Sequence, residues 1–403
     1  RDSFLDAGKG KMLLLMTARL CSSIYSLHDE SDIPDSYLKL VTESKDKSHE
    51  AFMLLLRFIE KNIPIFIQDD DVRGESSPVP SKSMKCIFVP PVQKIISYGI
   101  DVELAYGIVR KALNYVPSDS SFDEVTLNQE INRKIGNISN LISDDPRLWE
   151  VIPKDFYNAF WSLGLYDVFV PVQTYNNKLQ EIPLECEAAK AASTPPSTKK
   201  KEIDKLEITA SKLKEELAIQ NQNHQRVLEL IRTKKDKFFQ GLDEKVVNRD
   251  FMTYFCQYCI IPRFVMSSAD ALYCAKFVEL VHNEQVPMFN TLQYLSVVLG
   301  KLAPSYLICA TEQESRRLAT LLLSNFIMLD QWTSSEEQFK QHCDKIGFNR
   351  DVITNERVGF KEFTSKIIPS IHITCTQKFL FCLRGEQHQN LKNSLIVVLI
   401  LGN

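Results

Sequence analysis

The sequence has little glycine. Only 13 of its 403 residues are Gly, which is roughly 3% where soluble proteins average about 7%. A dinucleotide-binding sheet or a β-sandwich needs more glycine for its turns and phosphate loops. No long alternating strand pattern appears, so the composition favours helices and excludes the common β-rich folds.

An excess of one charge is also absent. The chain carries 48 Lys and Arg against 51 Asp and Glu, a formal net charge of −3, and its pI is near 6.2. This balance excludes a protein that coats nucleic acid along its full length. The longest apolar run, Leu395–Leu401, is much shorter than the ~20 residues that span a bilayer. We therefore expect no membrane partner. The chain starts at Arg1 and ends just after this run, so we expect a segment of a longer protein.

The ten cysteines show no regular disulfide spacing and follow no signal peptide. They indicate reduced thiols in a cytosolic or nuclear protein. Cys256 and Cys259 form a CxxC pair, but a zinc site needs four converging ligands and no second pair stands at finger-like spacing. Cys274 falls on a helical stripe of apolar residues, where free cysteine usually packs as a small hydrophobe. The sequence predicts core packing and no metal ligands.

Catalytic patterns are missing as well. No Ser/His/Asp or Cys/His grouping stands out among the seven dispersed histidines, and "GKGK" at 8–11 lacks the spacing of a phosphate loop. We therefore predict no catalytic residues, no cofactor and no enzymatic activity.

What the sequence has is amphipathic helix. Apolar residues recur at three- and four-residue spacing from Lys11 to about Gln180, including residues 102–113 and 130–142, and again from Phe251 onward. We predict an all-α fold, an extended array of helical hairpins, in four parts. They are a helical-repeat segment over 1–182, a flexible linker over the Pro- and Ser-containing stretch 183–200, a long helix over 201–240, and a second helical-repeat segment over 241–403.

The long helix carries an unbroken heptad seam. Its members are Ile203, Leu206, Ala210, Leu213, Leu217, Gln220, His224, Val227, Ile231, Lys234 and Phe238. We expect Leu206, Leu213, Leu217, Val227 and Ile231 to pack against a partner helix. The polar members Gln220, His224 and Lys234 are costly in a buried homodimer, so they favour a heterologous helix or a half-exposed strut.

The same helix is basic at both ends. From Lys199 to Lys237 there are 11 Lys or Arg and 7 Asp or Glu, a net charge of 11 − 7 = +4. One interpretation is an ordinary solvated surface. The other is a contact for RNA or an acidic partner, made by Lys199, Lys200, Lys201, Lys234, Lys235 and Lys237.

An aromatic cluster lies before this helix. Trp161, Phe160, Leu163, Leu165 and Tyr166 follow helical spacing, which is typical of a helix–helix packing centre. We predict core packing for them and no ligand contact.

Several stretches resemble one known family. They are "LWEVIPKDFYNAFWSLGLYDVFVPVQTYNNKL" (148–179), "NHQRVLELI", "CIIPRFVMSSADALYCAKFVELVH", "PMFNTL", "CATEQESRRLATLLL" and "NSLIVVL". In order and spacing they are similar to subunit 2 of the THO complex, a nuclear assembly that couples transcription to mRNA packaging and export.

The resemblance implies a non-catalytic nuclear scaffold of HEAT-like helical repeats, an α-solenoid. It implies binding to other THO complex subunits and to a DEAD-box RNA helicase. Two alternatives remain open from the residues alone: a generic helical-repeat adaptor of another assembly, and a helical-repeat protein that binds RNA directly.

Overall fold

The computed structural model describes residues 9–28, 35–62, 66–69, 83–86, 147–191, 195–308, 310–350, 353, 356–384 and 388–402. These residues are almost entirely helical, so the all-α prediction is confirmed. Two four-residue strands, β1 (Phe66–Asp69) and β2 (Ser83–Cys86), pair antiparallel with Phe66 opposite Cys86. The helices that the sequence predicts over 102–113 and 130–142 lie outside the described residues.

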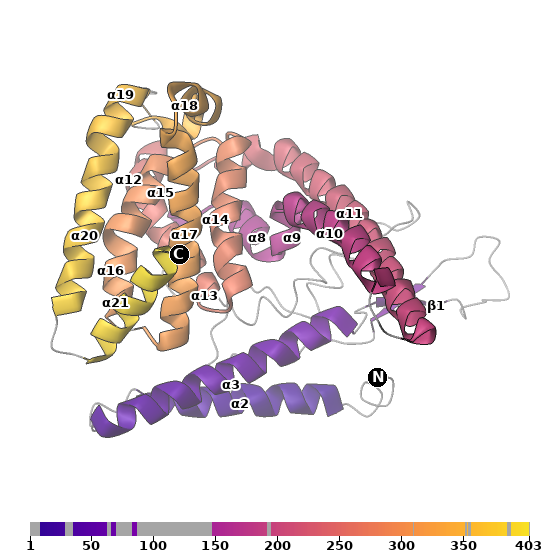
Figure 1. The fold of residues 1–403 in the computed structure, drawn as a ribbon. Helices are drawn as coiled ribbons and strands as arrows, with labels where there is room; N and C mark the ends of the chain where they lie inside the picture. Colours follow the sequence, from indigo (N-terminus) through magenta and orange to yellow (C-terminus); the bar gives the residue numbers. More distant parts are fainter. Residues whose placement is uncertain are drawn as a thin grey trace, which may run out of the picture.

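The two N-terminal helices form a hairpin beside the main bundle (Figure 1). They are α2 (Lys9–His28) and α3 (Asp35–Asn62). Polar contacts join α3 to the bundle. Among them, the Thr311 hydroxyl donates to the Asp46 carboxylate at 2.7 Å, Lys45 pairs with Glu314 at 3.3 Å, and His49 Nε2 donates to the Met266 carbonyl at 3.3 Å. The N-terminal hairpin therefore contacts residues more than 200 positions later in the chain.

The main bundle begins at residue 147. Its helices up to the long helix are α7 (Leu148–Val151), α8 (Lys154–Ser162), α9 (Leu165–Val168), α10 (Val172–Ala191) and α11 (Pro196–Phe238). Those that follow are α12 (Glu244–Phe255), α13 (Ile261–Phe264), α14 (Ser268–Asn283), α15 (Thr291–Val297), α16 (Ala303–Leu307), α17 (Glu312–Thr333), α18 (Glu336–Cys343), α19 (Phe360–Glu362), α20 (Ile368–Arg384) and α21 (His388–Leu401). Among these described helices, none is long and apolar enough to cross a membrane.

An aromatic core joins the early and late helices of this bundle. The Phe156 ring on α8 lies 5.5–6.0 Å from six other rings. These are the rings of Phe238, Phe239, Phe251, Phe255, Phe277 and Phe289. Aromatic pairs at such distances add to the apolar area they bury. The C-terminal end of α11 is thus fixed in the core.

The packing centre predicted around Trp161 is present with one exception. Phe160, Trp161 and Leu163 are buried, and Leu165 packs on the core as a half-buried side chain. Tyr166 is 52% exposed, so its predicted burial was wrong. The backbone is extended at Leu163 and Gly164 between α8 and α9, which breaks the single helical period that the prediction assumed.

Three helices continue through a proline by widening into a π-helical turn. The turns are Cys256–Ile260, Val298–Leu302 and Phe363–Ile367. Each stands two residues before a proline: Pro262, Pro304 or Pro369. Proline offers no N–H and its ring clashes with the carbonyl four residues back, and an inserted π turn relieves this clash.

The carbonyls freed by one π turn are bonded by the next layer of helices. Gly300, four residues before Pro304, accepts a hydrogen bond from the Lys378 ammonium on α20. Its neighbour Leu299 accepts from the Cys375 thiol at 3.2 Å. The proline therefore creates a docking point that fixes α20 against α15 and α16.

The prediction of a flexible linker over 183–200 is wrong for the described residues of this stretch, which are almost all helical. Residues 183–191 belong to α10, with Pro183 inside the helix, and residues 196–200 begin α11. Pro196 occupies the first helical turn, where a missing N–H costs nothing. The Ala, Glu and Lys residues after Pro183 are strong helix formers, and burial of Ala189 adds tertiary support. The long helix consequently begins five residues before its predicted start.

Candidate partner-binding surfaces

The heptad seam of α11 is covered by this chain itself. Along the first half of α11 the seam positions, Leu206, Leu213 and Leu217 among them, are half-buried, while most residues between them are exposed. The partner is α10, which packs against α11 as a hairpin that projects from the bundle (Figure 1). The covered positions of α10 have the same four-three spacing: Tyr175, Leu179, Ile182, Cys186 and Ala189.

The second half of the seam lies in the bundle core. Val227 and Ile231 are buried in the same apolar cluster as the α8 aromatic residues. A partner helix was expected for all five apolar seam residues. The structure places that partner inside the chain: α10 packs on the first half of the seam, and the bundle core encloses Val227 and Ile231.

The polar seam positions also find partners within the chain. The His224 ring Nδ1 donates to the Asp167 carbonyl at 2.8 Å, and the Asn223 amide donates to the Asp167 carboxylate at 2.5 Å. Gln220 lies beside the Tyr175 hydroxyl of α10. Lys234 is exposed, and its neighbour Lys235 occupies the covered position instead. The His224 and Asn223 contacts therefore join α11 to α9, and the Gln220 contact lies within the α10–α11 hairpin.

The basic residues at the two ends of α11 do not form one surface. Residues 201 and 234 are 33 positions apart, which is about 50 Å along a helix. Lys199 Nζ donates to the Lys190 carbonyl at 2.8 Å, and Lys235 Nζ donates to the Glu284 carbonyl at 2.9 Å. Both lysines therefore cap the C-terminal ends of α10 and α14, where a cation is favourable. Of the six lysines predicted to contact RNA or an acidic partner, the exposed ones are Lys200, Lys201, Lys234 and Lys237.

The cysteines of the CxxC region are core residues. Cys256, Cys259 and Cys274 are buried and form no disulfide, and the burial of Cys274 confirms its predicted packing. Burial raises the pKa of the Cys256 and Cys274 thiols, so both remain protonated. In the part of the chain that the structure describes, no three His, Cys, Asp or Glu side chains are grouped to hold a metal ion.

Two buried polar side chains were missed from the sequence. Arg263 is fully buried: its guanidinium donates to the Phe160 carbonyl and, at 2.6 Å, to the Leu163 carbonyl, and it lies 3.3 Å from Asp270. His282 is bonded through both ring nitrogens. Such contacts join helices and leave neither group accessible to a ligand. No local signal marks them, because their partners lie between 7 and 103 residues away and most are far apart in the sequence.

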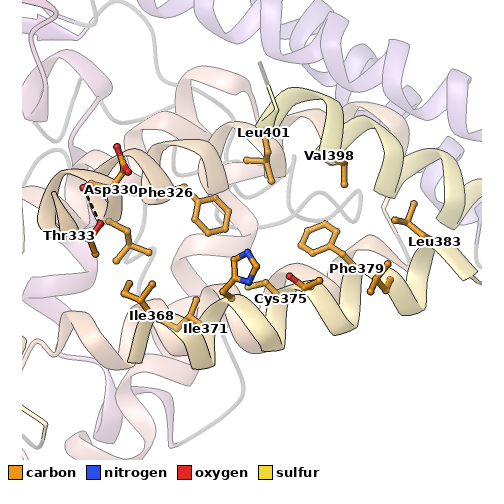
Figure 2. Close-up of a pocket in the computed structure, with 14 residues that line it drawn as sticks. Phe326, Asp330, Thr333, Ile368, Ile371, Cys375, Phe379, Leu383, Val398 and Leu401 are labelled. Carbon is orange, nitrogen blue, oxygen red and sulfur yellow. Dashed lines mark hydrogen bonds between the residues drawn. The ribbon is translucent and has the colours of Figure 1, made fainter. Parts of the chain in front are cut away.

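An apolar groove opens between α17, α20 and α21 (Figure 2). It encloses about 560 Å³. Its lining residues are Phe326, Leu329, Asp330, Thr333, Ile368, Ile371, His372, Cys375, Thr376, Phe379, Leu380, Leu383, Val398 and Leu401. The sequence hinted at this surface through the run Leu395–Leu401, since a helix that is apolar on all sides leaves one face to be covered.

Comparison with known proteins identifies similar chains. The family model described as transcription factor/nuclear export subunit protein 2 (Tho2) matches residues 149–401. THO complex subunit 2 of Arabidopsis thaliana is 25% identical over 437 residues, covering 99% of this chain and 22% of that protein. The Homo sapiens protein of the same name is 29% identical over 262 residues, covering 62% of this chain and 16% of that protein. The Saccharomyces cerevisiae protein is 24% identical over 210 residues, 51% of this chain and 12% of that protein. The matched region thus spans about a fifth or less of these relatives.

Proposed function

This chain belongs to the THO complex subunit 2 family, and from that premise we propose that it is a non-catalytic scaffold segment of a nuclear THO complex. The observation that carries the proposal is the family match over residues 149–401, because that range contains nearly the whole bundle. Through this complex the chain takes part in mRNA packaging and export. Its partners are the other THO subunits and a DEAD-box RNA helicase.

The arrangement of the helices supports a scaffold of HEAT-like repeats. Several consecutive helices pack as hairpins, as in α2–α3, α10–α11 and α20–α21, and α17 packs in turn against α14 and α21. An array of this kind exposes long surfaces without needing a single central site. The buried Arg263, His282 and cysteines join helices, which agrees with an architectural role.

Affinity purification tests the proposal. The chain is tagged, recovered from nuclear extract after nuclease treatment, and its partners are identified by mass spectrometry. We expect THO subunits in stoichiometric amounts, because contacts between proteins survive the loss of RNA. Recovery of an unrelated assembly without THO subunits would favour the generic adaptor and refute the proposal.

Direct RNA binding is a second candidate because Lys200 and Lys201 at one end of α11, and Lys234 and Lys237 at the other, are exposed. The two pairs lie about 50 Å apart on the helix, so each offers few phosphate contacts at once. We expect weak RNA affinity that falls steeply with salt. Filter binding with single-stranded RNA at two salt concentrations, for the natural chain and a Lys200→Ser/Lys201→Ser/Lys234→Ser/Lys237→Ser variant, separates this activity from protein assembly.

A further inference from the structure

We propose that the groove between α17, α20 and α21 binds an amphipathic α-helix of a partner protein that carries a basic residue at one end. The inference rests on the proposed scaffold function and adds to it a docking site and the chemistry of its occupant. Four properties of the described residues support it: fixed walls, an apolar lining, length and charge.

Hydrogen bonds and an ion pair to neighbouring segments hold α20 and α21, two walls of the groove, in place. On α20, the Cys375 thiol and the Lys378 ammonium donate to the carbonyls of the Val298–Leu302 π turn. On α21, the Asn393 amide donates to the Ala310 carbonyl at 2.7 Å, and Lys392 pairs with Glu312 at 2.5 Å. Because these contacts fix both helices in place, the groove is formed before any partner arrives, which lowers the entropic cost of binding.

The lining is apolar and the apolar surface continues past the rim. Leu380 and Val398 line the groove yet remain 40% and 44% exposed. Phe381 on α20 is also exposed. Large exposed apolar patches mark interaction sites. An open groove with an apolar rim suits a helix, which rests partly outside, better than a lipid chain, which needs an enclosed tunnel.

The dimensions select a short helix. The lining positions of α20 run from Ile368 to Leu383, 15 positions that cover about 22 Å at 1.5 Å per residue. An occupant of about four turns matches this length, with apolar anchors at i, i+3 or i+4, i+7 and i+11.

Charge at one end of the groove specifies the basic residue. Asp330 lines the groove in the last turn of α17, where the helix dipole is negative and an acidic side chain is unfavourable. No cation among the described residues pairs with its carboxylate. Figure 2 shows Asp330 and Thr333 at the end of the groove where α20 and α21 diverge. A Lys or Arg of the partner meets both the carboxylate and the C-terminal carbonyls of α17.

Fluorescence anisotropy with labelled peptides of about 16 residues tests the proposal on the full chain. Two peptides carry leucines at i, i+3, i+7 and i+11 and one lysine, placed in the first turn of one peptide and in the last turn of the other. Two further peptides have glutamate at the position of that lysine. We expect saturable binding of one lysine peptide and at least about tenfold weaker binding to Leu380→Asp/Val398→Asp. The matched control is Ile373→Asp/Leu399→Asp, with the same change on the same two helices at exposed positions that do not line the groove. We expect it to bind within about twofold of the natural chain.

A charge exchange tests the role of Asp330. Asp330→Lys should weaken the lysine peptide and restore affinity for the glutamate peptide. No saturable binding of any peptide overturns the proposal, as does an equal loss in the groove variant and its control. Saturable binding of oleate that Val398→Asp abolishes, with no peptide binding, assigns the groove to a lipid instead. Copurification of THO subunits without peptide binding would refute the groove alone, whereas peptide binding without THO subunits would refute the scaffold proposal alone.

Discussion

At the scale of single residues, His282 links three segments through a neutral imidazole. Nε2 donates to the His342 carbonyl at 2.8 Å, and Nδ1 accepts from the Thr291 hydroxyl at 2.8 Å. Burial lowers the pKa of His282 to about 4. Burial likewise lowers the pKa of His49 to about 4, at the contact of α3 with the bundle. Both histidines therefore stay uncharged in the folded protein at neutral pH.

These shifted pKa values predict acid sensitivity. The unfolded chain binds protons below about pH 6.5, whereas the folded chain binds them only near pH 4. Stability is complete above pH 6.5 and falls as the pH drops toward 4, by roughly 3 kcal/mol for each histidine. Urea unfolding at several pH values checks this. In His282→Gln the unfolding free energy should depend less steeply on pH between pH 6 and 4.5, by the equivalent of about one proton. An unchanged slope would show that His282 does not titrate differently on folding.

Arg263 should be the most sensitive charged residue in the bundle. Arg263→Met removes the side-chain donor to the Leu163 carbonyl. It also removes one of the donors to the Phe160 carbonyl and to the Asp270 carboxylate, which keep the hydroxyls of Tyr273 and Ser267. Removing one member of a buried ionic network typically costs about 3–5 kcal/mol. Urea denaturation measures the loss. Arg249→Met removes an exposed partner of Asp250 and serves as the matched control, whose unfolding midpoint should not move. Equal midpoints for both variants would contradict the role given to Arg263.

Sequence patterns predicted some residues and missed others for a physical reason. The burial of Cys274 follows from local helical spacing. Arg263 has no such signature, because the two carbonyls that accept from it are about a hundred positions earlier in the chain. Long-range partners of this kind become visible only when the fold brings them together.

At the scale of helices, the α10–α11 hairpin shows what a heptad pattern predicts. The positions of the α11 seam could be read from its spacing, including Leu206, Leu213 and Leu217. The identity of its partner could not, because Pro183 and the neighbouring polar residues made α10 resemble a linker. A heptad seam specifies a covered stripe, and any helix of matching period can cover it.

Weakening the seam should open this hairpin locally. Leu213→Ser/Leu217→Ser removes apolar contact with α10, at an expected cost of about 1–3 kcal/mol, while the core around Phe156 remains intact. Amide hydrogen exchange in α10 should then accelerate roughly tenfold or more. Ile208→Ser/Ile219→Ser makes the same kind of change at exposed positions of α11. If this control accelerates exchange as much, the covered stripe has been assigned to the wrong face.

The π turn of Val298–Leu302 should depend on Lys378. Lys378→Met leaves the Gly300 carbonyl without its donor, and an unsatisfied buried carbonyl costs about 1–3 kcal/mol. In a Pro304→Ala background the backbone N–H at position 304 can donate to the Gly300 carbonyl, so Lys378→Met should destabilise that background less. A double-mutant cycle measured by thermal unfolding gives the coupling. Strictly additive losses would show that the proline and the lysine act independently.

At the scale of the whole molecule, the fold class follows from composition and periodicity, while the arrangement does not. Scarce glycine and helical spacing are local properties, and they predicted an all-α chain. The contact of α3 with the start of α17, and the groove between α17, α20 and α21, depend on which amphipathic faces meet. The same limit applies to binding surfaces: the seam that looked available is covered, and the apolar face of α20 and α21 remains open.

Hydrogen exchange of the chain, alone and in a reconstituted THO complex, tests the central claim most directly. The account predicts that the seam of α11 is protected in the isolated chain and changes little on assembly, because α10 and the core already cover it. It predicts new protection in α20 and α21 when the partner subunits bind. A seam that exchanges freely in the isolated chain and becomes protected only in the complex, with α20 and α21 unchanged, would contradict the account.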